Sequence, residues 1–305
     1  MAKSIGVVIT ENVAAGAVGE SNGDESHRVS QLRVFPGPEE NRDSLLDMPT
    51  QDLVDLLAGL AESIAAGGPI DAVGLAFPGI VRNGEIEDSP NLPQLKGVRI
   101  VDLMHKALES RGIHAKLAAV NDAHAIAAGI AAMEGRMAGP EHPPLTRVWT
   151  LGIGIGFGHY PLAGGVWEAG HSVVSLDPNE TFCGCGGRGH LEGILGYRAM
   201  RLRFLDLEPE EVFELAKSGE DPRCVEFRLL WHRALAAAVA TSIHLEGPGK
   251  FYFTGSSVHF LDLKFLGRSV QEMVKMSPLL SYNFEVFEQG NEAAIVGAAV
   301  NARNS

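Results

Sequence analysis

Short runs of apolar residues alternate along the chain with longer segments in which apolar residues recur three and four positions apart. Residues 5–10 and 70–77 have the length and composition of buried strands. Residues 50–66 have the helical spacing instead, so they predict an amphipathic helix that begins behind a Thr50 cap. Strands and helices that alternate in this order are typical of an α/β fold.

The same periodicity predicts elements along the rest of the chain. Strands are expected at residues 115–120, 147–153 and 251–254, and helices at residues 98–111, 123–134, 191–205, 210–217, 226–245 and 291–302. Residues 82–97 are expected to be a loop, residues 136–146 an exposed connector, and the glycine-bearing residues 151–165 a hairpin. Asn121 and Asp122 fall where a strand passes into a helix, which suits a ligand cleft.

Composition limits the kinds of partner. With 305 residues and 45% hydrophobic content, the chain can bury a large core and divide into two lobes. A net charge of −13 disfavours nucleic acid and anionic membranes, because both would repel the surface. The three cysteines make a poor disulfide framework, and the first residues lack the apolar run of a secretory signal. No apolar run is long enough to span a bilayer. We therefore expect a small-molecule ligand and a cytoplasmic protein.

A cluster of metal-ligand residue types lies just beyond the middle of the chain. Cys183, Cys185 and His190 fall within eight residues, and His171 lies twelve positions before Cys183. Two thiolates and two imidazoles complete a tetrahedral zinc site, and the glycines between them let a short loop turn its side chains onto one point. A lone histidine or cysteine is more often an ordinary packing or surface residue, as we expect for Cys224 and His232. The joint spacing therefore predicts structural Zn²⁺.

Several short motifs, taken in order, resemble the ROK family of bacterial sugar kinases and related sugar-responsive repressors. The matching segments cover most of the chain, at residues 73–79, 89–93, 120–124 and 168–171 and in the Cys-x-Cys-Gly-x-x-Gly-x-Leu-Glu signature at residues 183–192. Each motif is short, but the order and spacing of the set are specific. Where the family signature carries a third cysteine this chain has His190, so the resemblance implies a Cys2His2 zinc set of His171, Cys183, Cys185 and His190.

The resemblance implies a two-lobed actin-like ATPase fold, which is related to ribonuclease H, with a sugar and a nucleotide clamped between the lobes. The expected N-terminal lobe comprises residues 1–118 and 291–305, because the C-terminal helix returns to it. The expected C-terminal lobe comprises residues 119–290 and carries the zinc-binding loop. The resemblance also implies a homodimer.

The sugar site of the family maps onto residues that are all present here. The implied sugar ligands are Asn91, Asn121, Asp122, Glu168, His171 and Glu192. Carboxylates and amides exchange hydrogen bonds with vicinal hydroxyls, so this set suits a sugar. The resemblance assigns Asp122 as the catalytic base that takes the proton from the attacking hydroxyl. The alternative is that Asp122 only caps the helix beginning at Ala123.

The first phosphate loop departs from the family pattern. The family carries Asp-x-Gly-Gly-Thr after its first strand, whereas residues 8–12 here read Val-Ile-Thr-Glu-Asn. The carboxylate that organises Mg²⁺ has become Val8, and both glycines are absent. Glu11 would place a negative charge where triphosphate oxygens are expected, although it could bind Mg²⁺ instead.

The second phosphate loop keeps its glycines. Gly152, Gly154 and Gly156 lie in a run that continues to Gly158, but Ile153 replaces the usual hydroxyl residue. The alternative interpretation is a strand against which another backbone packs. Near the expected adenine end, Gly255 begins a Gly-Ser-Ser sequence in place of three glycines.

Two functions follow from these motifs, and a third alternative is a cleft that serves another reaction, since a fold does not fix its chemistry. The first is an ATP- and Mg²⁺-dependent kinase that phosphorylates a hexose or N-acylhexosamine hydroxyl. The second is a catalytically impaired ROK-like protein that binds a sugar and acts as a sensor, scaffold or partner subunit. A DNA-binding repressor is disfavoured, because the expected sugar lobe begins at the first residues and leaves no room for a preceding helix-turn-helix.

Overall fold

The computed structural model describes residues 3–10, 12–20, 26–36, 45–137, 145–162, 165 and 168–305. The chain forms two units, one of residues 1–146, 158–166 and 289–305 and the other of residues 147–157 and 167–288. The boundary therefore passes through a strand, between Phe157 and Gly158.

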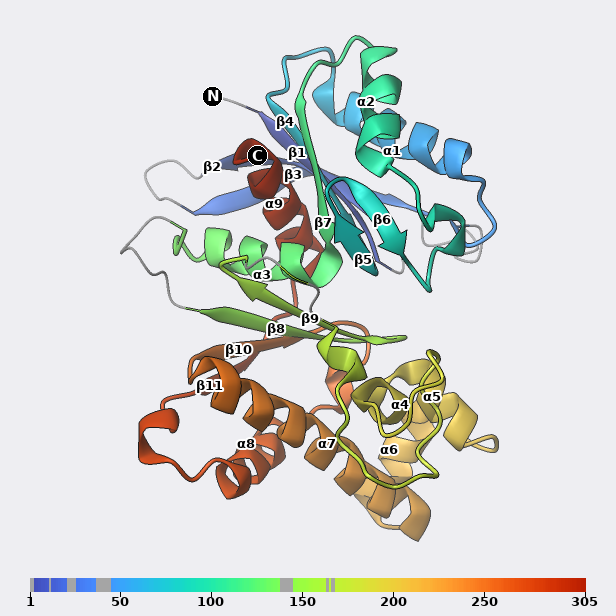
Figure 1. The fold of residues 1–305 in the computed structure, drawn as a ribbon, viewed down its shortest axis with the longest axis vertical. Helices are drawn as coiled ribbons and strands as arrows, with labels where there is room; N and C mark the ends of the chain where they lie inside the picture. The colour runs from blue at the N-terminus through green and yellow to red at the C-terminus, as the bar shows by residue number, and fades with distance from the viewer. Residues whose placement is uncertain are drawn as a thin grey trace. The chain divides into compact units, whose positions relative to one another are not determined.

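Strands and helices follow one another as the alternating pattern predicts (Figure 1). The strands are β1 (Ser4–Ile9), β2 (Val13–Glu20), β3 (His27–Phe35), β4 (Ala72–Phe77), β5 (Ile80–Arg82), β6 (Glu85–Asp88), β7 (Lys116–Asn121), β8 (Thr146–Leu151), β9 (Ile155–Tyr160), β10 (Lys250–Thr254) and β11 (Asn283–Val286). The helices are α1 (Thr50–Ala65), α2 (Ile100–Glu109), α3 (Asp122–Met133), α4 (Leu191–Leu195), α5 (Tyr197–Arg203), α6 (Pro209–Ser218), α7 (Pro222–Glu246), α8 (Leu263–Met273) and α9 (Gly290–Arg303).

The first unit is built on a mixed sheet with strand order β3-β2-β1-β4-β7. β1, β4 and β7 run parallel, whereas β2 and β3 are added as an antiparallel meander. Alternate residues of β1 face opposite sides of the sheet. Ile5, Val7 and Ile9 point into a core that they share with the apolar faces of α1 and α2.

The other face of this sheet is covered by α9, which packs beside α3 (Figure 1). The close approach depends on glycines in the strands. A Cβ at Gly6 would lie 2.0 Å from the carbonyl oxygen of Ile295, and one at Gly74 would lie 1.8 Å from that of Ala298. The C-terminal helix therefore completes the first unit, because no side chain separates its backbone from the sheet.

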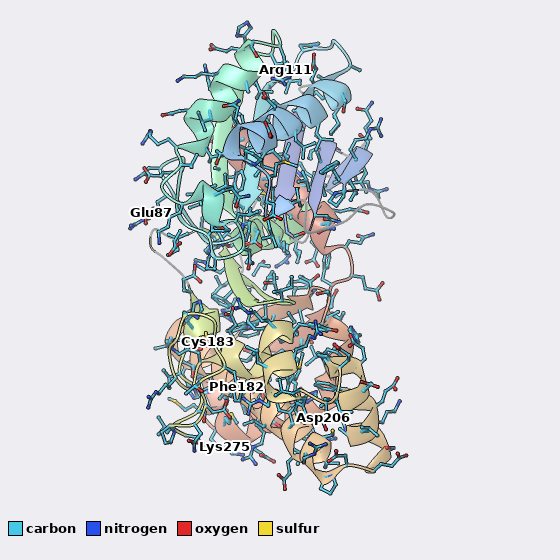
Figure 2. The ribbon with its side chains drawn as sticks, turned by 90° about the vertical axis from the view of Figure 1, so that its right-hand side faces the viewer. Glu87, Arg111, Phe182, Cys183, Asp206 and Lys275 are labelled. Carbon is cyan, nitrogen blue, oxygen red and sulfur yellow. The ribbon has the colours of Figure 1, made fainter. Side chains whose placement is uncertain are left out.

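The second unit contains the sheet β11-β10-β8-β9. Phe251 and Phe253 of β10 are fully buried, in one core with Trp231 of α7 and Leu266 of α8. Side chains of this unit, Phe182 and Cys183 among them, are labelled in Figure 2. Leu191 and Ile194 of α4 are buried in the same core.

Most predicted elements are confirmed to within a few residues, with four differences. Thr50 does not cap α1, since the cap position is Pro49 and the Thr50 hydroxyl donates to the Gln94 carbonyl oxygen, 2.9 Å away. Within the predicted loop at residues 82–97, residues 85–88 form β6, which pairs with β5 in a hairpin. The predicted helix at residues 191–205 is divided at Gly196 into α4 and α5. The strands β2, β3, β5 and β11 and the helix α8 are not among the predicted elements.

The two units place residues 119–146, including α3, with the first unit. The predicted lobe boundary between residues 118 and 119 stays a proposal. Within the described part of the chain, no helix combines the length and the apolar character needed to cross a membrane.

Candidate active site

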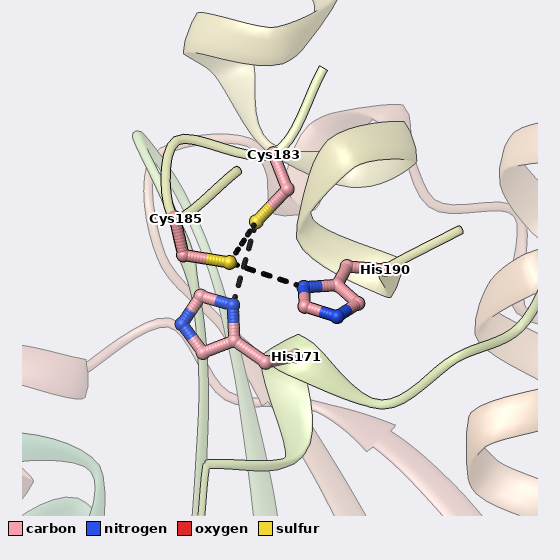
Figure 3. A group of neighbouring side chains, drawn as sticks. All are labelled: His171, Cys183, Cys185 and His190. Atoms are coloured by element: carbon pink, nitrogen blue, oxygen red, sulfur yellow. Dashed lines mark hydrogen bonds between the residues drawn. The ribbon is translucent and has the colours of Figure 1, made fainter. Parts of the chain in front are cut away.

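Four side chains from one stretch of the second unit converge on a point (Figure 3). His171 ends the short 3-10 helix Ala169–His171, Cys183 and Cys185 lie in the following loop, and His190 is the cap residue of α4. One ligand atom from each residue lies within 4.8 Å of the others. The structure therefore brings together all four residues that the sequence predicted as metal ligands.

Three of the distances between these atoms are close to the edges of a zinc tetrahedron. The Sγ of Cys183 is 3.4 Å from the Nδ1 of His171 and 3.4 Å from the Sγ of Cys185, and that second sulfur is 3.2 Å from the Nδ1 of His190. Ordinary Zn–N and Zn–S bonds give tetrahedron edges of about 3.3–3.8 Å. Donor type, number and spacing therefore suit a divalent ion such as zinc.

Two glycines allow the loop to close around these ligands. A Cβ at Gly187 would lie 2.0 Å from the His190 ring, so any larger residue would displace that imidazole. Gly189 has a φ of 68° and would place a Cβ 1.9 Å from the carbonyl oxygen of Ser175. Glycine is the residue that adopts this left-handed conformation without strain. The glycines of the signature are therefore needed for the shape of the cluster.

A buried arginine supports the same loop from α5. The Arg203 guanidinium pairs with the carboxylate of Glu180, and both side chains are largely shielded from solvent. It also lies 4.3 Å from the Phe182 ring centroid and donates to the carbonyl oxygen of Gly193. These contacts hold the chain on both sides of Cys183 without a metal ion.

The protonation of Cys183 depends on its surroundings. Burial is the main cause of a pKa of about 12 for its thiol, and the neighbouring Glu192 carboxylate contributes to the increase. A metal ion must therefore displace a proton to bind this sulfur. By contrast, Cys224 and His232 are buried within α7, as the sequence predicted for packing residues.

Three of the predicted sugar ligands lie near this cluster in the second unit. His171 turns its Nδ1 toward the sulfurs, while its Nε2 lies 4.0 Å from a carboxylate oxygen of Glu168. Glu192, in the first turn of α4, has its Oε1 3.7 Å from the Sγ of Cys183. A metal ion held by His171 and Cys183 would therefore constrain the positions of both carboxylates.

The other predicted sugar ligands lie in the first unit. Asn121, not Asp122, caps α3, because its Oδ1 accepts the His124 N–H at 3.2 Å. Its Nδ2 donates to the Gly79 carbonyl oxygen at 2.9 Å, which ties the end of β7 to the turn after β4. Asp122 is the first helical residue, and its Oδ1 accepts the Ala123 N–H at 2.9 Å. Asn91 is exposed in the loop before residues 93–95. The N-cap of α3, which the alternative assigned to Asp122, is therefore Asn121.

A pair of buried histidines lies at the same end of α3. The rings of His124 and His159 meet edge to face with centroids 5.1 Å apart. Burial, with a smaller effect from His159, lowers the pKa of His124 to about 4. The Nε2 of His124 is buried without a hydrogen-bond partner among the described residues. His124 is therefore neutral at pH 7.

The first phosphate loop offers no carboxylate at position 8. Val8 is 1% exposed within β1, where the family pattern has the aspartate that organises Mg²⁺. Thr10 closes the turn to β2 by donating its N–H to the Asn12 carbonyl oxygen at 2.9 Å. Glu11 lies outside the described residues, so both interpretations of its charge stay open.

The second phosphate loop forms the turn between β8 and β9, and we call residues 152–156 the glycine turn. The Ile155 N–H donates to the Oε2 of Glu192 and the Gly156 N–H to the hydroxyl of Thr150, each at 3.0 Å. The carbonyl oxygens of Gly152 and Ile153 accept from the first N–H groups of α5. Much of the turn's polar backbone is therefore already engaged.

Close backbone packing accounts for two further glycines. A Cβ at Gly158 would lie 2.0 Å from the carbonyl oxygen of Ala123, so this glycine admits the start of α3. Gly255 has a φ of 107°, and a Cβ there would lie 2.3 Å from the carbonyl oxygen of Leu151. The packing interpretation therefore applies to Gly158, whereas the nucleotide role of Gly152, Gly154, Gly156 and Gly255 stays a prediction.

Sequence reasoning missed two residues that position the site. Thr150 supplies a hydroxyl to the glycine turn, and Arg203 holds the loop around Cys183. No sequence signal singled out Thr150, because its strand also contains Thr146 and Arg147. No sequence signal pointed to Arg203, because its partner Glu180 lies 23 positions away.

Comparisons with known proteins show what this chain is similar to. A sequence profile described as ROK family matches residues 5–305. A glucokinase from Pyrobaculum calidifontis is 28% identical over 262 residues, which are 81% of this chain and 83% of that protein. A ROK hexokinase structure from Thermus thermophilus matches 99% of this chain and 100% of its own, with 24% identity and a TM-score of 0.74.

A ROK family glucokinase structure from Streptomyces griseus, in complex with glucose and AMPPNP, matches the same shares of the two chains with 23% identity and a TM-score of 0.69. The likeness to these structures shows the two-lobed actin-like ATPase fold. Because the profile extends over nearly the whole length, the chain belongs to the ROK family.

Proposed function

We propose that this protein is a ROK-type sugar kinase that transfers the γ-phosphoryl group of ATP to a hydroxyl of a hexose or an N-acylhexosamine. The observation that carries the proposal is the Asn121-Asp122 pair, which is held where β7 meets α3 in a chain whose relatives include a glucokinase. The proposed sugar ligands are Asn91, Asn121, Asp122, Glu168, His171 and Glu192.

Asp122 is the proposed catalytic base. Asn121 takes the capping role at the start of α3, and the Asp122 carboxylate accepts the N–H of the next residue, Ala123. A carboxylate at this place accepts the proton of the sugar hydroxyl as that hydroxyl attacks the phosphoryl group. General-base assistance of this kind contributes about 10² to 10⁴ in rate.

Zinc is the proposed metal of the Cys/His cluster. His171, Cys183, Cys185 and His190 would hold it, and four protein ligands leave no open position for a substrate. Its contribution is structural, since it would stabilise the fold of the loop and orient His171. Elemental analysis of the purified protein should give one zinc per chain, and a folded preparation without stoichiometric zinc would contradict the assignment.

A second candidate function is a sugar-binding protein with impaired catalysis. It is supported by the buried Val8 in place of a Mg²⁺-organising carboxylate and by the engaged N–H groups of the glycine turn. The described residues of the first phosphate loop do not fit the family's Mg²⁺ site, so we assign no residue to Mg²⁺. The glycine turn and Gly255 remain the proposed nucleotide contacts of an active kinase.

One paired assay separates the two functions. A panel of hexoses and N-acylhexosamines is tested for phosphorylation with ATP, GTP and polyphosphate, and for a change in the melting temperature of the protein. Turnover together with a rise in melting temperature supports the kinase. A rise without turnover supports the impaired sugar-binding protein. The absence of both effects overturns both proposals. The homodimer and the cytoplasmic location stay predictions, and light scattering tests the first.

A further inference from the structure

The glycine turn has two backbone N–H groups to offer an anion. Ile155 and Gly156 donate to Glu192 and Thr150, and Gly152 donates to the carbonyl oxygen of Gly154. Within the described part of the chain, the N–H groups of Ile153 and Gly154 have no acceptor. Successive backbone N–H groups in a turn form an anion-binding concavity.

A carboxylate is placed directly beside this pair. The Oε2 of Glu192 accepts the Ile155 N–H at 3.0 Å, and a Cβ at Gly154 would lie 2.6 Å from the same oxygen. The Oε1 of Glu192 lies 3.7 Å from the Cys183 sulfur, so the same carboxylate adjoins both the glycine turn and the metal cluster. Its negative charge therefore occupies one side of the turn.

An anion that binds the Ile153 and Gly154 N–H groups would come close to that charge. Two like charges a few ångströms apart in a partly buried site repel each other strongly, and salt screens such a pair only weakly. A phosphate chain must therefore overcome this repulsion, unless the carboxylate is moved or its oxygens are engaged by hydroxyl donors.

We propose that Glu192 is a positioning residue that makes binding of the phosphate donor depend on the sugar. In the sugar-free protein its carboxylate is held on the glycine turn and weakens binding of nucleotide phosphates. Sugar hydroxyls that donate to this carboxylate compete with the Ile155 N–H for it and reduce the repulsion. The proposal rests on the proposed sugar role of Glu192, and it adds a coupling between sugar binding and phosphate binding at this carboxylate.

The experiment is a calorimetric titration of the zinc-loaded protein with AMPPNP. It is done without sugar and with a saturating amount of the hexose that raises the melting temperature most. We expect the wild-type protein to bind AMPPNP about tenfold more tightly when the sugar is present. By thermodynamic reciprocity, AMPPNP must tighten sugar binding by the same factor.

The variant Glu192→Gln removes the charge and keeps an oxygen that can accept the Ile155 N–H. Its affinity for AMPPNP without sugar should rise about tenfold above that of the wild type. A purely structural role for Glu192 predicts the opposite, since a damaged turn would bind AMPPNP less well. Asp206→Asn is the control, because it removes an exposed carboxylate of the same unit that pairs with Arg223. Its sugar-free affinity should stay within about twofold of the wild type.

The outcomes distinguish this inference from the proposed function. If the wild type binds sugar and AMPPNP independently of each other, or if Glu192→Gln does not tighten sugar-free binding, the inference is overturned while a sugar kinase remains possible. If the wild type binds no sugar, the proposed function fails, and the sugar-free titration of Glu192→Gln still decides whether the charge opposes phosphate. If the variant does not fold, independent binding of sugar and AMPPNP by the wild type still overturns the inference.

Discussion

Two glycine-rich loops of the second unit differ in what they offer a ligand. The loop around Cys183 and Cys185 presents four side-chain ligand atoms that converge on one point. The glycine turn at residues 152–156 uses much of its polar backbone for contacts with Glu192, Thr150 and α5. The first loop is thus complete for its proposed ligand, whereas the second is partly satisfied by the protein itself.

The difference shows when the presence of a family motif also indicates the function of that motif. Cysteine and histidine side chains are specific for metals, so their presence and geometry together are strong support for the metal site. Glycines permit either phosphate binding or close packing, and the environment decides between the two. At Gly158 the environment is the carbonyl oxygen of Ala123, not an open space.

The largest expected effect is on catalysis. Replacing Asp122 by Asn should lower kcat by about 10² to 10⁴, because the general base is lost, while sugar binding persists. Steady-state kinetics and a sugar titration of the variant measure the two effects. Loss of sugar binding with no separate change in kcat would instead indicate a binding residue. Turnover by the wild type would also show that a phosphate donor binds although the backbone of the glycine turn is partly engaged, and would break the comparison above.

The next largest expected effect is a loss of stability when the contacts of Arg203 with the metal-binding loop are removed. Arg203→Ala leaves Glu180 buried without its partner, which should lower the free energy of unfolding by about 3–5 kcal/mol. Denaturant unfolding measures the loss, and chelator-induced release of the metal should become faster. The control is Arg201→Ala on the same helix, whose exposed pair with Glu208 should contribute less than about 1 kcal/mol. Equal effects of the two substitutions would contradict a specific role of Arg203.

The start of α3 should respond to pH. The pKa of His124 is lowered from 6.5 to about 4, so the unfolded chain binds the proton more readily than the folded one. Its contribution to stability is therefore complete above about pH 6.5 and is lost as the pH falls toward about 4, by about 3 kcal/mol. Unfolding at a series of pH values should show this loss in the wild type and a flatter profile in His124→Gln. Parallel profiles would contradict the assignment.

A smaller effect is expected at Gly158. A methyl group there meets the backbone of Ala123, so Gly158→Ala should lower stability by about 1–3 kcal/mol. The control is Gly59→Ala in α1, where a Cβ meets nothing within 4 Å and the better helix propensity of alanine should raise stability by up to about 1 kcal/mol. Thermal melts of both variants provide the measurement. An unchanged melting temperature in Gly158→Ala would restore the phosphate interpretation of this glycine.

Much of the fold could be predicted because buried elements carry a periodic pattern. β1 and β4 are fully buried and read as continuous apolar runs. β3, by contrast, is an edge strand whose residues are mostly exposed, so nothing in its sequence marks one face. The break between α4 and α5 also depends on tertiary contact, since the Tyr197 N–H donates to the Gly152 carbonyl oxygen at 2.9 Å.

The candidate site was predictable where side chains define it. The four metal ligands are close in sequence, and Asn121 and Asp122 occupy a junction that the element pattern locates. The engagement of the glycine turn by Glu192 was not predictable, because it joins residues 37 positions apart through a backbone N–H group. Backbone donors leave no trace in the residue types.

The position of α9 against the glycines of β1 and β4 has a consequence for synthesis on the ribosome. The strands that it covers emerge early, but the helix belongs to residues 290–303, after the whole second unit has been translated. At about 5–20 residues per second, the 143 positions between Thr146 and Gln289 (289 − 146) take about 7–30 seconds. During that interval one face of the nascent sheet lacks its helix, so this surface is where a chaperone would be needed.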